Sequence, residues 1–254
     1  MSPKTVEKPE YGNWVSKKFI YMPGTIGIVC LGLTFLSAWW AIPAVIFLVI
    51  AAYFLYARTL FSPQGGDIQN RIRALVLEHL HWDGNGQVLD IGCGNAALAI
   101  ALAHKYPRAT VTGIDYWGAN WEYSQAVCEK NAQLEKVGER ATFRKASASK
   151  LPFDNESFDA VASNLTFHEV SDSADKRDLV REALRVVKKG GKFAFQDLFL
   201  MKPVYGEAQE LLETIRSWGI EKVEFIETRQ ADFIPDALKL PFMVGTLGLI
   251  VGKK

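Results

Sequence analysis

The feature that most constrains this chain is an uninterrupted run of 39 uncharged residues, 19–57, with Lys17 and Lys18 before it and Arg58 after it. As a single helix, at 1.5 Å per residue, this run would reach roughly 58 Å, about twice the ~30 Å hydrocarbon thickness of a bilayer. It is also much longer than the apolar core of a secretory signal. Two short helices joined by a turn near residues 37–43 therefore fit better than one long helix.

The residues at this turn and at the two ends of the run favour a membrane hairpin. Tryptophan prefers the membrane interface, as at Trp39 and Trp40, and Pro43 is tolerated in the first turn of a second helix. The flanking cations place both ends on the cytoplasmic side, and the lack of internal charges is typical of an anchor, not a transport path. The sequence thus predicts a multi-pass membrane anchor, with a buried hairpin of a soluble protein or an in-plane re-entrant loop as the alternatives.

Composition excludes several classes of function. Lys and Arg total 29 against 28 Asp and Glu, a net charge of +1, so we expect no nucleic-acid partner, which would require a basic surface. The three cysteines, Cys30, Cys93 and Cys128, are scattered and odd in number. They give neither a disulfide framework nor a metal-ligand spacing, and they suit a reducing compartment. No metal site is expected.

The remainder of the chain alternates predicted strands and helices. We divide the sequence into a polar N-terminal segment (1–18), the hairpin (19–60), a linker (61–66) and a domain spanning 67–254. Repeated strand–helix units imply a largely parallel sheet with helices on both faces. We expect strands at 87–91, 110–114, 141–144, 158–163, 192–198, 222–227 and 247–251, and helices at 67–80, 97–105, 119–137, 175–187 and 205–218. Residues 188–191, two lysines and two glycines, are interpreted as the end of the helix at 175–187.

A glycine turn follows the first predicted strand. Gly92 and Gly94 occupy positions where φ must be positive or a ligand must approach the backbone closely. In a doubly wound sheet, this point at the carboxyl end of the strand is where ligands bind. With Ala97 and an acid about 20 residues on, the turn also satisfies the dinucleotide fingerprint. Asp90 argues against that alternative, because a carboxylate there repels a pyrophosphate but can hold an ammonium group.

Taken in order, these motifs resemble class I S-adenosylmethionine-dependent methyltransferases. The resemblance rests on Val-Leu-Asp-Ile-Gly-Cys-Gly at 88–94, Gly-Ile-Asp at 113–115, and Leu-Pro-Phe followed by Ser-Phe-Asp at 151–159. It covers about residues 67–254 and implies a Rossmann-like, doubly wound, mostly parallel seven-stranded sheet. It also implies S-adenosylmethionine as the cofactor.

The resemblance assigns the glycine turn to the methionine part of this cofactor. The loop matching Gly92 and Gly94 passes under that part, with Cys93 as a small filler between them. Asp90 would orient the amino group directly or through water; a helix-capping role is the alternative. The third glycine of the usual motif is Ala96 here, which narrows the approach to the turn.

Other matches concern the adenosine and the sulfonium. Asp115 would bind the ribose hydroxyls and Tyr116 would lie against the adenine, unless they are a solvated carboxylate and a packing residue. Ser147 and Ala148 would meet the adenine edge, and Asn164 would lie beside the sulfonium. The usual acid falls on Ser147, whose hydroxyl accepts a hydrogen bond without charge assistance. Ser147 can also be an ordinary loop hydroxyl.

The acceptor side offers two candidate catalytic residues. His168 follows the fourth predicted strand and has a pKa suited to a general base; a structural role is the alternative. Asp197 ends the strand at 192–198. A membrane anchor would concentrate lipophilic molecules, so we expect a small or lipid-like methyl acceptor. The alternative functions are a methyltransferase-like scaffold without turnover and a nicotinamide oxidoreductase.

Overall fold

The computed structural model describes residues 7–118, 123–220 and 222–254, and the chain divides into two compact units. One unit comprises Met1–Gly12 together with Arg73–Lys254, and the other is Asn13–Ile72. Helix α3 (Ile68–His79) crosses the boundary between them.

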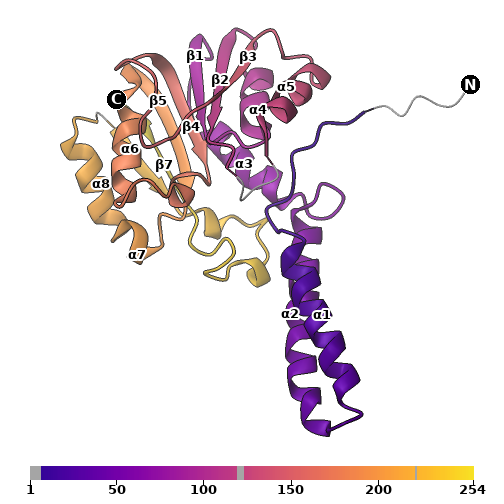
Figure 1. Ribbon diagram of the computed structural model, residues 1–254. Coiled ribbons are helices and arrows are strands. Elements are labelled where there is room, and N and C mark those ends of the chain that lie inside the picture. The colour runs from indigo at the N-terminus through magenta and orange to yellow at the C-terminus, as the bar shows by residue number, and fades with distance from the viewer. Residues whose placement is uncertain (1–6, 119–122, 221) are drawn as a thin grey trace, which may run out of the picture. The chain divides into compact units, whose positions relative to one another are not determined.

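The larger unit is built on a mixed seven-stranded sheet with the order β3-β2-β1-β4-β5-β7-β6 (Figure 1). The pairs β3–β2, β2–β1, β1–β4 and β4–β5 are parallel, whereas β7 runs antiparallel to both β5 and β6. The sequence order reverses beside β1, which makes the carboxyl end of β1 the topological switch point where such sheets bind ligands. The strands are β1 (Gly86–Ile91), β2 (Ala109–Asp115), β3 (Ala141–Lys145), β4 (Phe158–Asn164), β5 (Val187–Asp197), β6 (Lys222–Ile226) and β7 (Gly248–Lys253).

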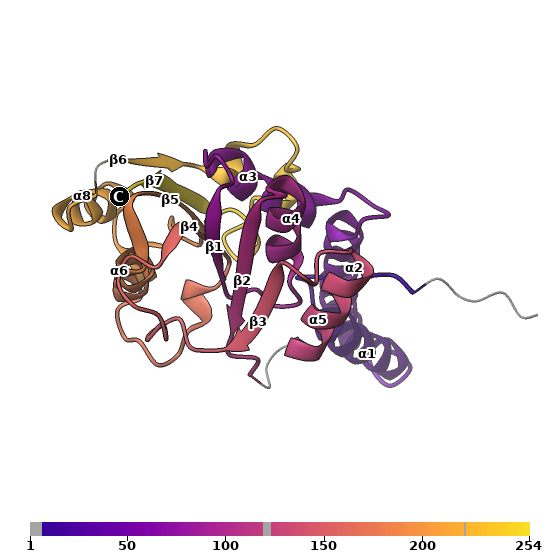
Figure 2. The same ribbon diagram turned by 90° about the horizontal axis from the view of Figure 1, so that it is seen from above.

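Helices cover both faces of this sheet, as the view from above shows (Figure 2). Successive side chains of β1 point to opposite faces. Leu89 and Ile91 join a buried cluster with α6 and α8, whereas Val88 joins the cluster formed with α3, α4 and α5. These helices are α4 (Ala97–Lys105), α5 (Gln125–Leu134), α6 (Lys176–Arg185) and α8 (Ala208–Ser217), with the single turn α7 (Lys202–Tyr205) before α8.

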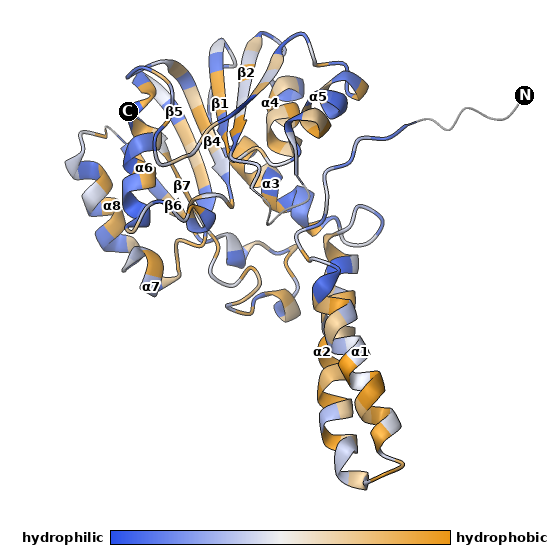
Figure 3. Ribbon diagram, in the orientation of Figure 1, coloured by the Kyte–Doolittle hydropathy of each residue, from blue (hydrophilic) through white to orange (hydrophobic). Residues whose placement is uncertain are grey.

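The smaller unit contains a hairpin of two apolar helices, α1 (Lys18–Leu33) and α2 (Ala41–Phe61), with a 3-10 turn (Ala38–Trp40) before α2 (Figure 3). The helices pack closely at Gly27, which has no side chain: a Cβ at this position would lie only 2.8 Å from Cγ of Leu48. Ala38–Phe61, with a mean hydropathy of 2.2, is long and apolar enough to cross a membrane. Helix α1 is also apolar but has only 16 residues.

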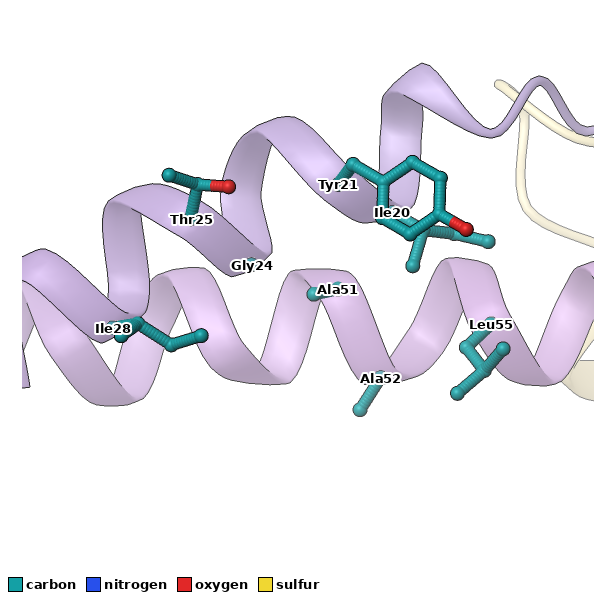
Figure 4. A pocket seen from close by; sticks show the side chains of 8 residues that line it. All are labelled: Ile20, Tyr21, Gly24, Thr25, Ile28, Ala51, Ala52 and Leu55. Carbon is teal, nitrogen blue, oxygen red and sulfur yellow. The ribbon is translucent and has the colours of Figure 1, made fainter.

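An open apolar groove of about 250 Å³ runs between the two helices of the hairpin (Figure 4). Small residues create it, since Gly24, Ala51 and Ala52 leave room along the contact. Larger side chains complete its lining: Ile20, Tyr21, Thr25, Ile28 and Leu55.

Three element predictions need correction. The hairpin turn begins at residue 34, earlier than expected, and α2 starts two residues before Pro43. The lysines and glycines at 188–191 lie inside β5 and do not end a helix; Gly190, at φ +78°, accommodates a register shift against β4 there. The helix expected at 205–218 is broken at Gly206, at φ +76°. Part of the helix expected at 119–137 falls on residues 119–122, outside the described residues.

Candidate active site

The turn between β1 and α4 is tightly wound. The amides of Gly92 and Cys93 both donate to the Ile114 carbonyl, at 2.8 and 2.9 Å, which joins the turn to β2. Gly92 has φ +73°, and a side chain there would lie 2.0 Å from Oγ1 of Thr166. This glycine is therefore required by packing against the segment after β4 as well as by its backbone conformation. Ala96, at φ +68°, tolerates a left-handed conformation that costs a residue with a Cβ about 1 kcal/mol or more.

Gly94 lies at the centre of a small hydrogen-bonded network. Its amide donates to Oδ2 of Asp115 at 2.9 Å. Its carbonyl accepts from the Trp117 indole at 2.9 Å and from the Cys128 thiol at 3.0 Å. A Cβ at Gly94 would lie 3.5 Å from the ring of Tyr123, so an aromatic ring flanks the turn.

Asp90 is a buried carboxyl group directly beneath this turn, only 1% exposed. Among the described residues, neither of its oxygens has a hydrogen-bond partner. Burial raises the pKa of Asp90 to about 7; the nearby Ala99 amide, whose geometry falls short of a hydrogen bond, and the Arg73 guanidinium lower it less, and Asp115 adds to the rise. A buried acid without a partner suits a cationic ligand group, so this position fits the ammonium of an amino-acid moiety.

Asp115, at the end of β2, is already held by the backbone. Besides the Gly94 amide, it accepts from the Trp117 amide at 2.8 Å through Oδ1. Each carboxylate oxygen keeps a second lone pair, which is what a ribose diol requires. Tyr116 is 63% exposed, and the Lys145 ammonium lies 5.0 Å from the centre of its ring.

Ser147 and Ala148 follow β3, at the same edge of the sheet. Ala148 is buried in the core. The Ser147 hydroxyl donates to Oδ2 of Asp172 at 2.9 Å, and Ser149 donates to the same oxygen at 2.7 Å. The Ser149 and Ser147 hydroxyls hold the pKa of Asp172 below its usual range, outweighing a small opposing effect of burial. A carboxylate therefore lies beside Ser147, although the sequence has no acid at that position.

Asn164 ends β4, next to the glycine turn. Its side-chain oxygen is buried and has no hydrogen-bond partner among the described residues. The following residues turn back toward β1, because the Thr166 hydroxyl donates to the Ile91 carbonyl at 3.0 Å. The orphaned oxygens of Asn164 and Asp90 thus belong to adjacent parallel strands and provide acceptors for a bound ligand.

His168 and Asp197, 29 residues apart in sequence, form a hydrogen-bonded pair. Nδ1 of His168 lies 2.8 Å from Oδ1 of the fully buried Asp197. Asp197 ends β5 and also accepts from the Tyr205 hydroxyl at 3.1 Å. Three backbone amides complete its partners, those of Thr166, Phe167 and Leu198.

This arrangement fixes the imidazole. An acceptor at Nδ1 assigns a proton to that nitrogen, which leaves Nε2 to exchange protons. Nε2 lies 3.4 Å from Oε1 of Glu169. Burial alone would lower the pKa of His168, but the hydrogen bonds and charges of Asp197 and Glu169 raise it to about 10.

Several residues at this site carried no sequence signal. Tyr123, Trp117 and Asp172 lie outside any motif. Chain folding brings Tyr123 and Trp117 to Gly94 from the segment after β2, and brings Asp172 to Ser147 from the segment after β4. Tyr205 and Glu169 are ordinary in sequence and gain a role only as neighbours of Asp197 and His168. A search for aromatic residues within ten positions of Asp115 would have found Trp117 and Tyr123 as candidates.

Comparisons with known proteins agree with this geometry. A family model described as a methyltransferase domain matches residues 89–195, from β1 to β5. An uncharacterized methyltransferase of Synechocystis sp. (strain ATCC 27184 / PCC 6803 / Kazusa) is 30% identical over 174 residues, which cover 66% of this chain and 74% of that protein. The chain belongs to the methyltransferase family. The acceptors left by Asp90, Asn164 and Asp115 fit S-adenosylmethionine as its cofactor.

Two further comparisons, one of sequence and one of structure, show other methyltransferases to which this chain is similar. The demethylmenaquinone methyltransferase of Roseiflexus castenholzii (strain DSM 13941 / HLO8) is 36% identical over 110 residues, 43% of this chain and 41% of that protein. The chain thus spans less than half the length of this relative. The geranyl diphosphate C-methyltransferase from Streptomyces coelicolor A3(2), solved with S-adenosyl-L-homocysteine, shares the fold, with a TM-score of 0.56 at 14% identity over 75% of this chain and 80% of that one.

Proposed function

We propose that this methyltransferase is anchored in a membrane by its hairpin and methylates a small lipophilic acceptor. The observation that carries the proposal is the location of exposed apolar side chains. Of the 21 large hydrophobic residues exposed in the described chain, 18 lie between Phe19 and Tyr56. A contiguous apolar surface of this kind marks contact with lipid or a partner, since the exposure of so much apolar surface to water is unfavourable.

The chemistry of the hairpin favours lipid as the surrounding medium. Residues 19–57 contain no charge, and Phe35 and Trp39 at the turn are 94% and 80% exposed. The cations lie at the opposite end, with Lys17 and Lys18 before α1 and Arg58 near the end of α2. In our proposal both ends of the hairpin, and with them the catalytic unit, face the cytoplasm.

The acceptor class follows from the anchor and from one relative. A hairpin in the bilayer concentrates membrane-resident molecules near the catalytic unit. The relative from Roseiflexus acts, by its name, on demethylmenaquinone, a quinone. Its similarity covers only 43% of this chain, so it supports a ring-bearing lipophilic acceptor as a class and no particular molecule.

The site residues take complementary parts in this proposal. When bound, the cofactor supplies an electrophilic methyl group on a sulfonium, and displacement requires the acceptor atom in line with it. Asp90 and the backbone of Gly92, Cys93 and Gly94 hold the methionine end. Asp115, with Tyr116, Ser147 and Ala148, would hold the adenosine, and Asn164 would hold the sulfonium end.

His168 is the proposed base of the reaction. Nε2 of His168 would take the proton that the acceptor atom loses on methylation. Asp197 accepts from Nδ1 at 2.8 Å and stabilises the imidazolium that results. The base must be deprotonated before turnover, so the acceptor has to displace Glu169 from Nε2.

The experiment that tests the proposal supplies labelled-methyl S-adenosylmethionine to membranes that contain the full-length protein. We expect label in the organic extract, and we expect His168→Asn to lower its rate of appearance about 100-fold or more. The matched control is His104→Asn, because His104 is also paired with a carboxylate, Glu135 at 3.3 Å, but lies on α4 away from the acceptor side. Label confined to water-soluble products would contradict the lipophilic acceptor, and equal rates in both variants would contradict the base.

A further inference from the structure

The N-terminal residues 7–12 lie along α5 of the catalytic unit, far from α5 in sequence. The Glu10 amide donates to Oδ1 of Asn131 at 2.9 Å, and Nδ2 of Asn131 donates back to the Glu10 carbonyl at 2.9 Å. The Tyr11 hydroxyl donates to Glu135 at 3.2 Å, and Lys130 pairs with Glu7 at 3.1 Å. We refer to residues 7–12 as the N-terminal strap.

Asn131 connects this strap to the glycine turn. Its side chain is 1% exposed, and Nδ2 makes a second bond, to the Asn95 carbonyl at 3.0 Å. Asn95 directly follows Gly94, and its own side chain accepts from the Ser124 amide at 3.3 Å. One buried amide thus satisfies the strap backbone and the backbone of the turn together. Losing such an amide leaves buried groups without partners, which is costly.

Tyr123 forms a second connection between the strap and the turn. A Cβ at Gly12, the last strap residue, would lie 3.2 Å from the Tyr123 ring, and a Cβ at Gly94 would lie 3.5 Å from the same ring. The ring therefore packs between the two backbones. Burial raises the pKa of the Tyr123 hydroxyl, as Asp115 and Glu169 do, while Arg73 lowers it. The hydroxyl is thus within electrostatic reach of carboxylates on both the cofactor side and the acceptor side.

We propose that the N-terminal strap retains the cofactor, with Asn131 as the positioning residue that couples the strap to the glycine turn. By holding Tyr123 beside Gly94, the strap restricts the exit of the methionine end of S-adenosylmethionine and of S-adenosylhomocysteine. The inference concerns donor retention only and holds for any acceptor and with or without membrane insertion.

Reciprocity provides a test on the unmodified full-length protein. If the strap increases affinity for S-adenosylhomocysteine by some factor, saturating S-adenosylhomocysteine must stabilise the closed strap by the same factor. Amide hydrogen exchange at Glu10 reports strap opening, since this amide donates to Asn131. We expect exchange at residues 7–12 to slow about tenfold when the ligand is bound. Exchange unchanged by bound ligand would overturn the proposal.

Variants test the same coupling through ligand kinetics. Asn131→Ala removes both links made by the amide, and we expect S-adenosylhomocysteine to dissociate about tenfold faster, with the association rate within about twofold of wild type. Glu129→Ala is the matched control on α5, because it removes only an exposed hydrogen bond from Gln125 and no contact with the strap. An Asn131→Ala protein that binds and releases ligand like the control would overturn the role of Asn131.

A second variant guards against misfolding of Asn131→Ala. Gly12→Val leaves α5 intact and acts only on the strap, where φ is +71° and the Tyr123 ring is 3.2 Å away. We expect it to speed dissociation to a similar extent while the Tm of the ligand-free protein stays within about 2 °C of wild type. Unchanged dissociation in Gly12→Val, with the fold intact, would contradict retention by the strap.

Discussion

In our proposal, the Asp90 carboxyl group serves donor binding at the expense of stability. It is buried without a hydrogen-bond partner among the described residues, and burial raises its pKa to about 7. A folded-state pKa above the unfolded value means that ionisation destabilises the fold. The effect is absent below about pH 4, grows as the pH rises to about 7 and is complete above it; it amounts to at most about 4 kcal/mol.

Asp90→Asn should therefore stabilise the cofactor-free protein and weaken donor binding. The gain in Tm should be absent near pH 4 and several degrees at pH 8, as measured by calorimetry at the two pH values. Affinity for S-adenosylmethionine should fall about 10-fold to 100-fold at pH 8. A variant that loses stability at pH 8 would show that the carboxylate is well solvated in the fold, contrary to our interpretation.

Glu169 should set the pH at which His168 loses its proton. The pKa of His168 is raised to about 10, so the charged pair with Asp197 contributes stability below pH 6.5 and loses it as the pH rises toward 10. Since a base must be deprotonated, kcat should increase with pH in the alkaline range. Glu169→Gln removes one of the charges that retain the proton, so the rise should move to lower pH and kcat at pH 7.5 should increase about threefold.

The comparison for this experiment is Glu135→Gln, which removes the carboxylate paired with His104. Its pH profile should match that of wild type. A Glu169→Gln profile that also matches wild type would exclude His168 as the group whose ionisation limits the rate.

At this scale the sequence indicates donor-side residues better than their neighbours. Asp90 and Asp115 are identifiable because Asp90 is the last but one residue of β1 and Asp115 ends β2, each at a fixed distance from the glycines. Asp172 is not, because its place beside Ser147 depends on how the segment after β4 folds back toward the residues that follow β3. His168 and Asp197 were identifiable as separate candidates, but their pairing depends on the adjacent positions of β4 and β5 in the sheet.

Among the elements, the α1–α2 contact depends on one glycine. A side chain at Gly27 would lie 2.8 Å from Cγ of Leu48 and 3.1 Å from its backbone nitrogen, whereas a side chain at Gly32 would meet nothing within 4 Å. Gly27→Val should separate the helices and lower the stability of the hairpin in detergent by about 1–3 kcal/mol. Gly32→Val, in the same helix, should change it little. The measurement is the unfolding midpoint of both variants in one detergent, and equal midpoints would contradict close packing at Gly27.

Two glycines with positive φ differ in whether there is room for a side chain. Gly92 has φ +73° and a close neighbour, Thr166, 2.0 Å from the position of a Cβ, whereas Gly219 has φ +83° and open space. Gly219→Ala should therefore cost only the conformational term of about 1 kcal/mol. Gly92→Ala should cost more, about 3 kcal/mol or above, because the loop after β4 must move. Urea unfolding of the two variants measures the difference, and equal losses would show that the loop yields without cost.

Element boundaries were predictable where local signals agree. The helix after the glycine turn was predicted at 97–105 and is found there, because an alanine-rich run ends at Tyr106 and Pro107. The prediction of a helix end at 188–191 was wrong because lysines and glycines suit both a helix end and an irregularity in a strand. Only the pairing of β5 with β4 and β7 decides between them, and that pairing is not local.

For the whole molecule, the decisive question is what surrounds the hairpin. Ile46 and Val49 on α2 are 52% and 62% exposed, so in a soluble protein lysines at both positions would be nearly neutral. In a bilayer each lysine costs about 2.5–3.5 kcal/mol near the centre of a span. The double variant Ile46→Lys, Val49→Lys should therefore shift from the membrane fraction to the soluble fraction after alkaline extraction.

A comparable pair of exposed substitutions on α8, Gln209→Lys with Glu213→Lys, serves as the control and should leave membrane retention unchanged. Full retention of the α2 double variant would contradict insertion of the hairpin.

The class of the sheet was predictable from the alternation of strands and helices, and so was its number of strands. The antiparallel insertion of β7 between β5 and β6 was not, because no local pattern distinguishes it from a parallel edge strand.

The bond from the Trp117 indole to the Gly94 carbonyl gives the enzyme an intrinsic optical probe. Indole emission depends on the hydrogen bonding and polarity around the ring, and this indole donates to a carbonyl of the turn that we propose holds the methyl donor. The difference in emission between wild type and Trp117→Phe would isolate its signal from that of the other six tryptophans. Loading and emptying of the donor site could then be followed in real time, without any knowledge of the acceptor.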